Sequence, residues 1–188
     1  MSSEDTHFAR LVSLACHDLR TPLATIYGFA RTLTRMEEHD ERTARYLGMI
    51  EEASQQMTEL LDELGAAARI EAGRWEPLPR TVDTVDLARA DDEGVGVEGT
   101  GETIETDVDA VRSALRSLAV AALRHGPVEQ VRWSIAGREL VLSPVTPAAA
   151  PIVTGEEVRD LGALVAATVI RALGGSLELA GETLRVRL

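Results

Sequence analysis

Two long segments of this sequence repeat apolar residues in alternating steps of three and four, and this spacing constrains the fold more than any other feature. The first repeat occupies Val12, Ala15, Leu19, Pro22, Ile26, Phe29, Leu33 and Met36. The second occupies Leu47, Ile50, Ser54, Met57, Leu61, Leu64 and Ala68. Such a heptad repeat is typical of helices that pack along a seam. Because the polar residues 37–41 separate the two segments, the sequence predicts a helical hairpin over residues 5–72.

The apolar stripe of the second segment is wider than a single seam. Four further residues each precede a seam position, namely Tyr46, Ala53, Leu60 and Ala67. One hairpin has too little core of its own to cover both stripes, whereas two copies packed as a dimeric four-helix bundle cover them. We therefore expect a homodimer, although the seam alone does not exclude a plain structural coiled coil.

After Gly73, Pro77 and Pro79 the helical repeat stops, and shorter elements follow. The sequence predicts strands and turns over 80–107, a helix over 107–126, a hairpin over 131–145, a loop over 146–155, a helix over 156–173, and strands over 176–180 and 183–188. The expected fold class is therefore α+β. A helical domain over residues 1–76 precedes a small α/β sandwich over residues 77–188, with one sheet and helices on one of its faces.

Composition argues against several classes of function. The chain has 19 Lys and Arg residues against 31 Asp and Glu, a formal net charge of −12, and such a surface repels nucleic acid. No apolar run is long enough to span a membrane and no secretory signal opens the chain, so we expect a cytoplasmic protein without membrane association. The single cysteine, Cys16, fits a reducing compartment. The four histidines show no metal-site spacing, so no metal is expected.

The residues HDLRT at positions 17–21 place ionisable groups and a hydroxyl inside the first heptad segment. His17 falls at heptad position f, farthest from the seam, so its imidazole is expected to be exposed. The carboxylate of Asp18 can hold one imidazole N–H and leave the other ring nitrogen as a nucleophile. Arg20 and Thr21 follow at i+3 and i+4, so both flank His17 one turn on. A guanidinium there suits a phosphoryl group, and a hydroxyl there can position water.

The residues HDLRTPL, which end at Pro22 and Leu23, resemble the phosphoacceptor box of sensor histidine kinases. They also occur at the matching place, on the first helix of the dimerisation bundle. Residues 68–90 are similar to the end of the second helix and the start of the ATP domain in that family. The resemblance implies that His17 is phosphorylated, that Asp18 is its acid–base partner, and that Thr21 assists dephosphorylation. The simpler alternative is a polar surface cluster without function.

The same resemblance implies four nucleotide-binding segments in the second half, and this sequence departs from all of them. Ser117 and Ala121 stand where two magnesium-binding asparagines are expected, and the chain contains no asparagine. Residues 143–147, SPVTP, replace the adenine-binding Asp-x-Gly-x-Gly box. Residues 146–157 are short for an ATP lid. Asp160 replaces the first glycine of the last box, where a carboxylate repels a triphosphate. We therefore expect no ATP-dependent autophosphorylation and no bound cofactor.

Three functions are compatible with these features. A phosphorelay protein would carry a phosphoryl group on His17 between receiver aspartates of response regulators. A non-catalytic pseudokinase would dock and sequester a response regulator, and a receiver phosphatase would use Thr21 and water. The intact cluster beside a degenerate nucleotide site favours the relay, with residues 1–76 as dimerisation and phosphoacceptor domain and residues 77–188 as a degenerate ATPase domain. The predicted receiver-docking surface is Cys16, Arg20, Leu23, Ala24 and Tyr27.

Overall fold

The computed structural model describes residues 3–35, 40–89 and 92–188, apart from the side chains of residues 3–11, 13–15 and 18. The chain divides into two compact units, Met1–Arg74 and Trp75–Leu188. The roles assigned above to the two predicted domains remain predictions.

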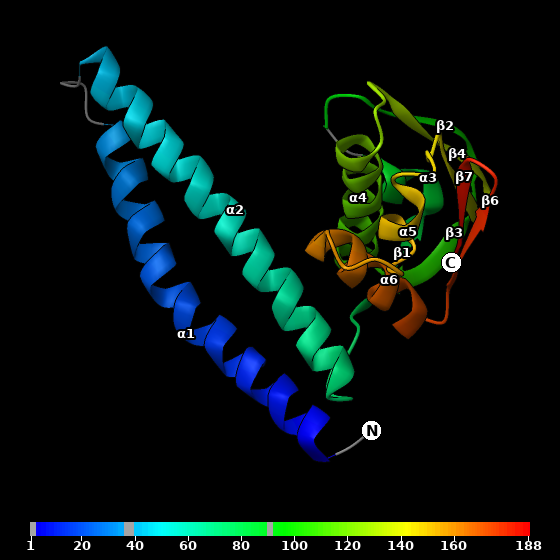
Figure 1. Ribbon diagram of the computed structural model, residues 1–188, viewed down its shortest axis with the longest axis horizontal. Helices are drawn as coiled ribbons and strands as arrows, with labels where there is room; N and C mark the ends of the chain where they lie inside the picture. The colour runs from blue at the N-terminus through cyan, green and yellow to red at the C-terminus, as the bar shows by residue number, and fades with distance from the viewer. Residues whose placement is uncertain (1–2, 36–39, 90–91) are drawn as a thin grey trace. The chain divides into compact units, whose positions relative to one another are not determined.

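Two long helices form the first unit (Figure 1), α1 (Ser3–Thr34) and α2 (Glu41–Glu71). The carboxylate of Asp40 caps α2, because it accepts a hydrogen bond from the backbone N–H of Thr43 at 2.7 Å. Just beyond the end of α2, Gly73 has a φ of 62°, a left-handed conformation that favours glycine. The predicted helical hairpin is confirmed, while the seam residue Met36 and residues 37–39 of the expected connection lie outside the described residues.

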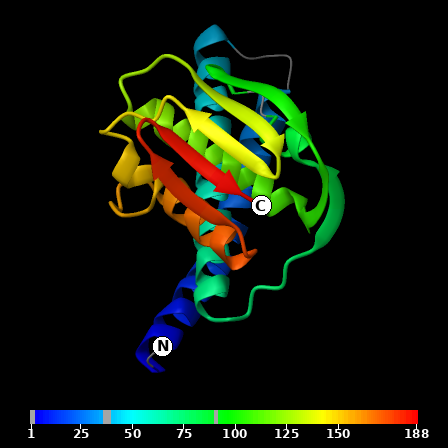
Figure 2. The ribbon, with the colours of Figure 1, turned by 90° about the vertical axis from the view of Figure 1, so that its right-hand side faces the viewer.

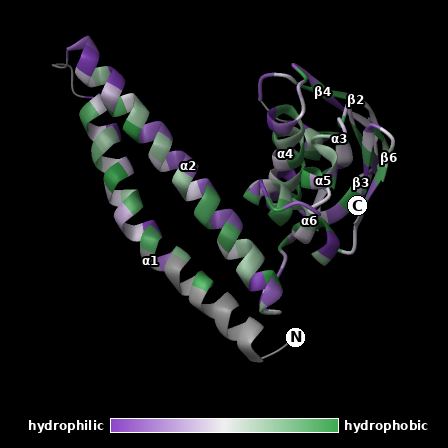
Figure 3. Cartoon of the chain, viewed as in Figure 1, coloured by the Kyte–Doolittle hydropathy of each residue, from purple (hydrophilic) through white to green (hydrophobic). Residues whose placement is uncertain are grey.

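The two helices of the hairpin meet through every seventh residue of α1. The contact residues Cys16, Leu23 and Ala30 are 2%, 4% and 3% exposed, whereas the seam residues Leu19 and Ile26 are 54% and 51% exposed. Apolar residues recur along both helices, as Figure 3 shows. The α1–α2 contact therefore lies to one side of the predicted seam of α1, whereas the seam residues Leu47, Ser54 and Ala68 of α2 are buried. Within the described residues, no helix is both long and apolar enough to cross a membrane.

The second unit is an α+β sandwich in which helices lie against one face of a sheet (Figure 2), as the sequence predicts. The sheet has the order β2-β4-β5-β7-β6, and its β2–β4 pair is parallel while the others are antiparallel. Its strands are β2 (Val95–Gly101), β4 (Val131–Gly137), β5 (Glu139–Ser143), β6 (Ser176–Ala180) and β7 (Thr183–Arg187). The helices are α3 (Thr84–Ala88), α4 (Val108–His125), α5 (Ala150–Val153) and α6 (Leu161–Ala172). A separate two-stranded sheet pairs β1 (Pro79–Asp83) with β3 (Thr103–Asp107).

Three details of this unit differ from the prediction. The prediction had one sheet, but β1 and β3 pair only with each other. The segment 146–155 was expected to be a loop, yet it contains the one-turn helix α5. The last helix begins at Leu161 rather than Glu156, because the Asp160 carboxylate accepts the Ala163 N–H at 3.1 Å and so caps α6.

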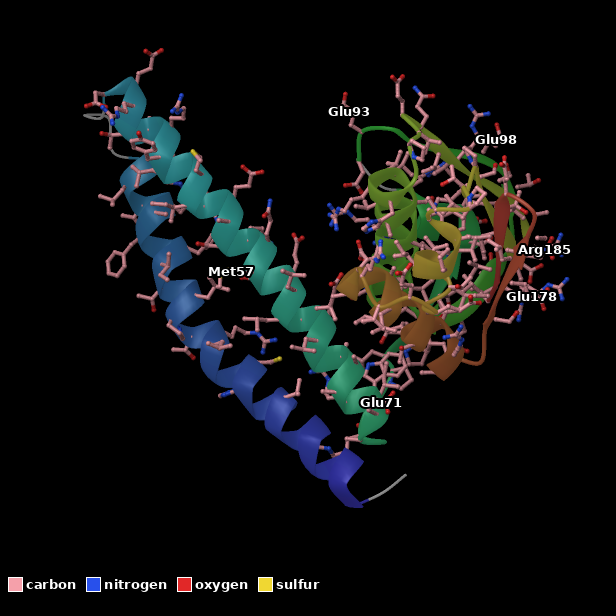
Figure 4. All side chains as sticks on the ribbon, in the orientation of Figure 1. Met57, Glu71, Glu93, Glu98, Glu178 and Arg185 are labelled. Carbon is pink, nitrogen blue, oxygen red and sulfur yellow. The ribbon has the colours of Figure 1, made fainter. Side chains whose placement is uncertain are left out.

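The core of the second unit lies on the inner face of the five-stranded sheet. Alternate residues of β4 and β5 are buried there, namely Val131, Trp133, Ile135, Leu140 and Leu142. The outer face is polar, and the side chains of Glu178 and Arg185 point away from the helices (Figure 4). On the same face, Oε1 of Glu139 lies 3.2 Å from Nε of Arg185, and Oε2 of Glu139 lies 3.0 Å from Nη2 of Arg187. These charges suit a sheet face in contact with water.

Candidate functional site

The polar cluster at residues 17–21 lies on the exposed side of α1. His17 is exposed, as its heptad position predicts. It lines an open surface hollow together with Arg20, Thr21, Ala24 and Thr25. Two of the predicted site residues therefore share this hollow with the imidazole. The side chain of Asp18 lies outside the described residues, so its pairing with His17 stays a prediction.

Tight helix packing supports the backbone beneath His17. The neighbouring side chain, Cys16, is buried against α2. Gly65 lies opposite on α2, also buried, and a Cβ atom there would be 3.9 Å from the Cβ of Cys16. The small residue brings the two backbones close together, and close packing of this kind resists displacement. The α1 backbone is thus fixed while His17 faces solvent.

A residue of α2 contributes to the charge of the site. The Nη2 atom of Arg20 lies 2.5 Å from Oδ1 of Asp62. Both side chains remain substantially exposed, at 43% and 59%. Sequence reasoning missed Asp62 because it lies 42 positions from Arg20. Only the register of the hairpin, which also places Gly65 opposite Cys16, brings it to the site.

The helix continues through the proline of the cluster. α1 runs from Ser3 to Thr34 with Pro22 inside it. One turn beyond Thr21, the hydroxyl of Thr25 donates a hydrogen bond to the Thr21 carbonyl at 3.1 Å. The two threonines that line the hollow therefore lie one turn apart on a helix that is continuous through Pro22.

The predicted docking surface is only partly exposed. Cys16 and Leu23 are buried between α1 and α2, so neither is available to a partner. Tyr27 is half-buried, and the Arg31 guanidinium lies 5.8 Å from the centre of its ring. The predicted docking surface is therefore wrong for Cys16 and Leu23. The reason is the phase of α1, which turns every seventh residue from Cys16 toward α2.

In the second unit, two positions predicted to have lost nucleotide contacts have structural roles instead. Ala121 is completely buried on α4 and belongs to the core. The Asp160 side chain is only 7% exposed and caps α6. Its Oδ2 atom lies 2.9 Å from Arg124 Nη1 and 3.1 Å from His125 Nε2. The carboxylate therefore occupies the N-terminus of α6 itself.

The pKa of Asp160 reflects this environment. Burial alone would raise the pKa of the carboxyl group, because it disfavours the charged form. The hydrogen bonds from Ala163 and His125 and the positive charge of Arg124 act in the opposite direction and hold the pKa below its ordinary value. Asp160 is thus a negative charge stabilised within the fold.

Comparison with known proteins identifies the first unit. Residues 9–73 match the model of the His Kinase A (phospho-acceptor) domain. These residues form a His Kinase A domain. The His17 hollow lies within this domain.

Two relatives that are similar to part of this chain are named as histidine kinases. The chain is 32% identical over 87 residues to the probable sensor histidine kinase TcrY of Mycobacterium tuberculosis, covering 46% of this chain and 18% of TcrY. It is 30% identical over 123 residues to the histidine protein kinase DivJ of Caulobacter vibrioides, covering 60% of this chain and 21% of DivJ. The chain thus spans about a fifth of the length of these two relatives.

The fold agrees with this assignment. The structure of full-length ShkA in complex with AMPPNP matches with a TM-score of 0.65 and 22% sequence identity, covering 94% of this chain and 44% of that one. At this identity the likeness concerns the fold alone. The His Kinase A hairpin followed by the mixed α/β domain is the fold of a histidine kinase core.

Proposed function

We propose that this protein is a phosphorelay component that carries a phosphoryl group on His17 between the receiver aspartates of response regulators. It does so as a homodimer, without ATP-dependent autophosphorylation. One contrast carries the proposal: His17 lies in an open hollow with Arg20 and Thr21, while Ala121 is buried and Asp160 is paired inside the fold.

The proposed reaction begins when an imidazole nitrogen of His17 attacks the phosphorus of an aspartyl phosphate. The N–P bond forms as the bond between phosphorus and the carboxylate oxygen breaks, and the receiver aspartate leaves as a carboxylate. Asp18 holds the proton on the other ring nitrogen and stabilises the positive charge of the phosphorylated ring. Arg20, in the same hollow, balances the phosphoryl charge. Transfer to a second receiver is the reverse sequence of bond changes.

Two features of the second unit support the proposal that the phosphoryl group on His17 does not come from ATP. The methyl side chain of Ala121 offers magnesium no oxygen ligand and is completely buried. Asp160 places a negative charge at the N-terminus of α6, where free N–H groups would otherwise attract phosphate. Calorimetry with millimolar ATP, with and without magnesium, should detect no saturable binding. Saturable binding would restore a kinase assignment.

A panel of phosphorylated receiver domains tests the relay directly. At least one receiver should label the wild-type protein, and the label should be labile in acid and stable in base, as a phosphoramidate bond is. His17→Gln should abolish the label while the oligomeric state stays unchanged, because the side chain of His17 is exposed at a heptad position outside the seam. If no receiver transfers its label but one still binds, the protein sequesters a response regulator instead.

A receiver phosphatase is the second candidate, because Thr21 lies in the same hollow as His17. Its hydroxyl would orient a water molecule toward the receiver's aspartyl phosphate. In that case the receiver loses phosphate to water at the same rate in the His17→Gln variant as in the wild type.

A further inference from the structure

We infer that Asp62 is a positioning residue for Arg20, and that the Arg20–Asp62 ion pair opens when His17 is phosphorylated, so that Arg20 turns to the phosphoryl group. This inference rests on the proposed function of His17. It adds a residue of α2 to a site that the sequence places wholly on α1.

The location of Arg20 between two anionic partners is the first argument. Arg20 lies three residues after His17, a spacing that makes side chains neighbours on a helix surface. Both residues line the same hollow. Asp62 approaches the guanidinium from the neighbouring helix, with a contact of 2.5 Å. Arg20 therefore lies where it can bind either a carboxylate on α2 or an anion on His17.

Exposure and charge give the second argument. Both side chains of the pair are substantially exposed, and exposed ion pairs are weak. A phosphoryl group carries nearly two negative charges and three acceptor oxygens, and a guanidinium binds such a group through two parallel hydrogen bonds. The phosphorylated imidazole is therefore a stronger partner for Arg20 than the single carboxylate of Asp62.

The exchange has a consequence for a relay. Before phosphorylation Asp62 neutralises Arg20, so the hollow attracts anions less strongly than an unpaired guanidinium would. After phosphorylation Asp62 competes for Arg20 and favours release of the phosphoryl group. Removing the carboxylate should speed the capture of an anionic phosphoryl donor, and it should do so only while Arg20 is present.

Chemical phosphorylation of the full chain with phosphoramidate tests this without a protein partner. The ring nitrogen of His17 forms an N–P bond, the N–P bond of phosphoramidate breaks, and ammonia leaves. We expect Asp62→Asn to raise the second-order rate constant of His17 labelling about two- to fivefold, the range set by an exposed ion pair. Arg20→Gln should lower it, and the double variant should match Arg20→Gln alone.

Glu52→Gln is the matched control. It removes one negative charge from an exposed position on α2, about 15 Å along the helix from Asp62. The labelling rate of Asp62→Asn must exceed that of this control. Equal labelling rates in Asp62→Asn and Glu52→Gln overturn the inference. A faster labelling rate that persists when Asp62→Asn is combined with Arg20→Gln also overturns it, because Asp62 would then act through the net charge of the protein or through its fold.

The outcome also separates this inference from the proposed function. Labelling that His17→Gln does not reduce, or an absence of labelling in the wild type, overturns the phosphoacceptor role and the inference with it. Labelling that depends on His17 but not on Asp62 leaves the proposed function standing and overturns the inference alone.

Discussion

Thr21 lines the same hollow as His17. We expect its hydroxyl to assist hydrolysis of the receiver's aspartyl phosphate rather than phosphoryl transfer to His17. Thr21→Ala should leave the rate of transfer to His17 unchanged. It should slow the loss of phosphate from the receiver to water about tenfold or more, since it removes a group that positions the attacking water. Quenched time courses with a labelled receiver measure both rates.

Thr32→Ala is the control for this substitution. Thr32 is also an exposed threonine on α1, and its hydroxyl donates to the Gly28 carbonyl at 2.7 Å. Thr32→Ala removes a hydroxyl from the same helix, but Thr32 does not line the hollow. Equal hydrolysis rates in the two variants would contradict a role for Thr21.

The charge of Asp160 should make the second unit less stable in acid. Its pKa in the folded protein lies below the ordinary value of 3.8, so its ionisation stabilises the fold above that value, and this contribution is lost as the pH falls through the folded pKa. We expect Asp160→Asn to lower the free energy of unfolding by about 1 kcal/mol at pH 7. The difference from wild type should shrink toward pH 3. Urea unfolding at pH 7, 5 and 3 measures it.

Glu156→Gln provides the comparison for Asp160. Glu156 is exposed just before α6, so removing its charge should change stability little at any of these pH values. If Asp160→Asn behaves in the same way, the contacts of Asp160 with Arg124 and His125 contribute nothing measurable to stability.

At the scale of elements, the close approach of α1 and α2 gives a prediction at Gly65. Glycine costs about 0.5–1 kcal/mol relative to alanine inside a helix. A Cβ atom at Gly65 would meet only the mobile end of Arg69, at 3.3 Å, and the Cβ of Cys16, at 3.9 Å. Gly65→Ala should therefore raise the free energy of unfolding, whereas Gly65→Leu should lower it by about 1–3 kcal/mol, because the larger side chain meets Cys16.

Thermal unfolding at one fixed protein concentration compares these variants. Gly48→Ala is the control, because a Cβ atom at this α2 glycine has nothing within 4 Å and should stabilise by a similar amount. If Gly65→Leu is as stable as Gly65→Ala, α1 and α2 are not in close contact beneath His17.

Most of the elements were predictable because their signals are local. The heptad steps define both long helices, and the grouping of His17 with Arg20 and Thr21 follows from helical spacing alone. The start of α6 was predictable too, since an aspartate at position 160 before an apolar helix is an N-cap signal that outweighs the acidic residues upstream.

The remaining features depend on how elements meet. Asp62 reaches Arg20 only through the register of the hairpin, which no local pattern specifies. Leu23 is buried because the α1–α2 contact runs along one side of the heptad seam, and either side is compatible with the repeat. The pairing of β1 with β3 outside the main sheet likewise depends on tertiary contacts that no local pattern specifies.

At the scale of the whole molecule, one chain leaves a large apolar surface on its hairpin. Among the side chains that the structure describes, the large exposed apolar residues of α1 and α2 are Leu19, Ile26, Phe29, Leu33, Tyr46, Met49, Ile50, Met57 and Leu60. A groove between the helices is lined by several of them, including Ile26, Ile50 and Met57. Apolar patches of this kind on a soluble protein mark contact surfaces, and a second hairpin would cover this one as a four-helix bundle.

We therefore expect the protein to be a homodimer, with a mass in light scattering twice that of the chain. Ile26→Asp should shift the mass toward that of a monomer or unfold the hairpin, because dimerisation would bury an unpaired carboxylate. Val158→Asp is the control: this residue is 73% exposed in the second unit, so the charge stays in water and the mass should stay unchanged. A monomeric wild-type protein at micromolar concentration would contradict the four-helix bundle. A folded Ile26→Asp variant with the same mass as the wild type would also contradict it.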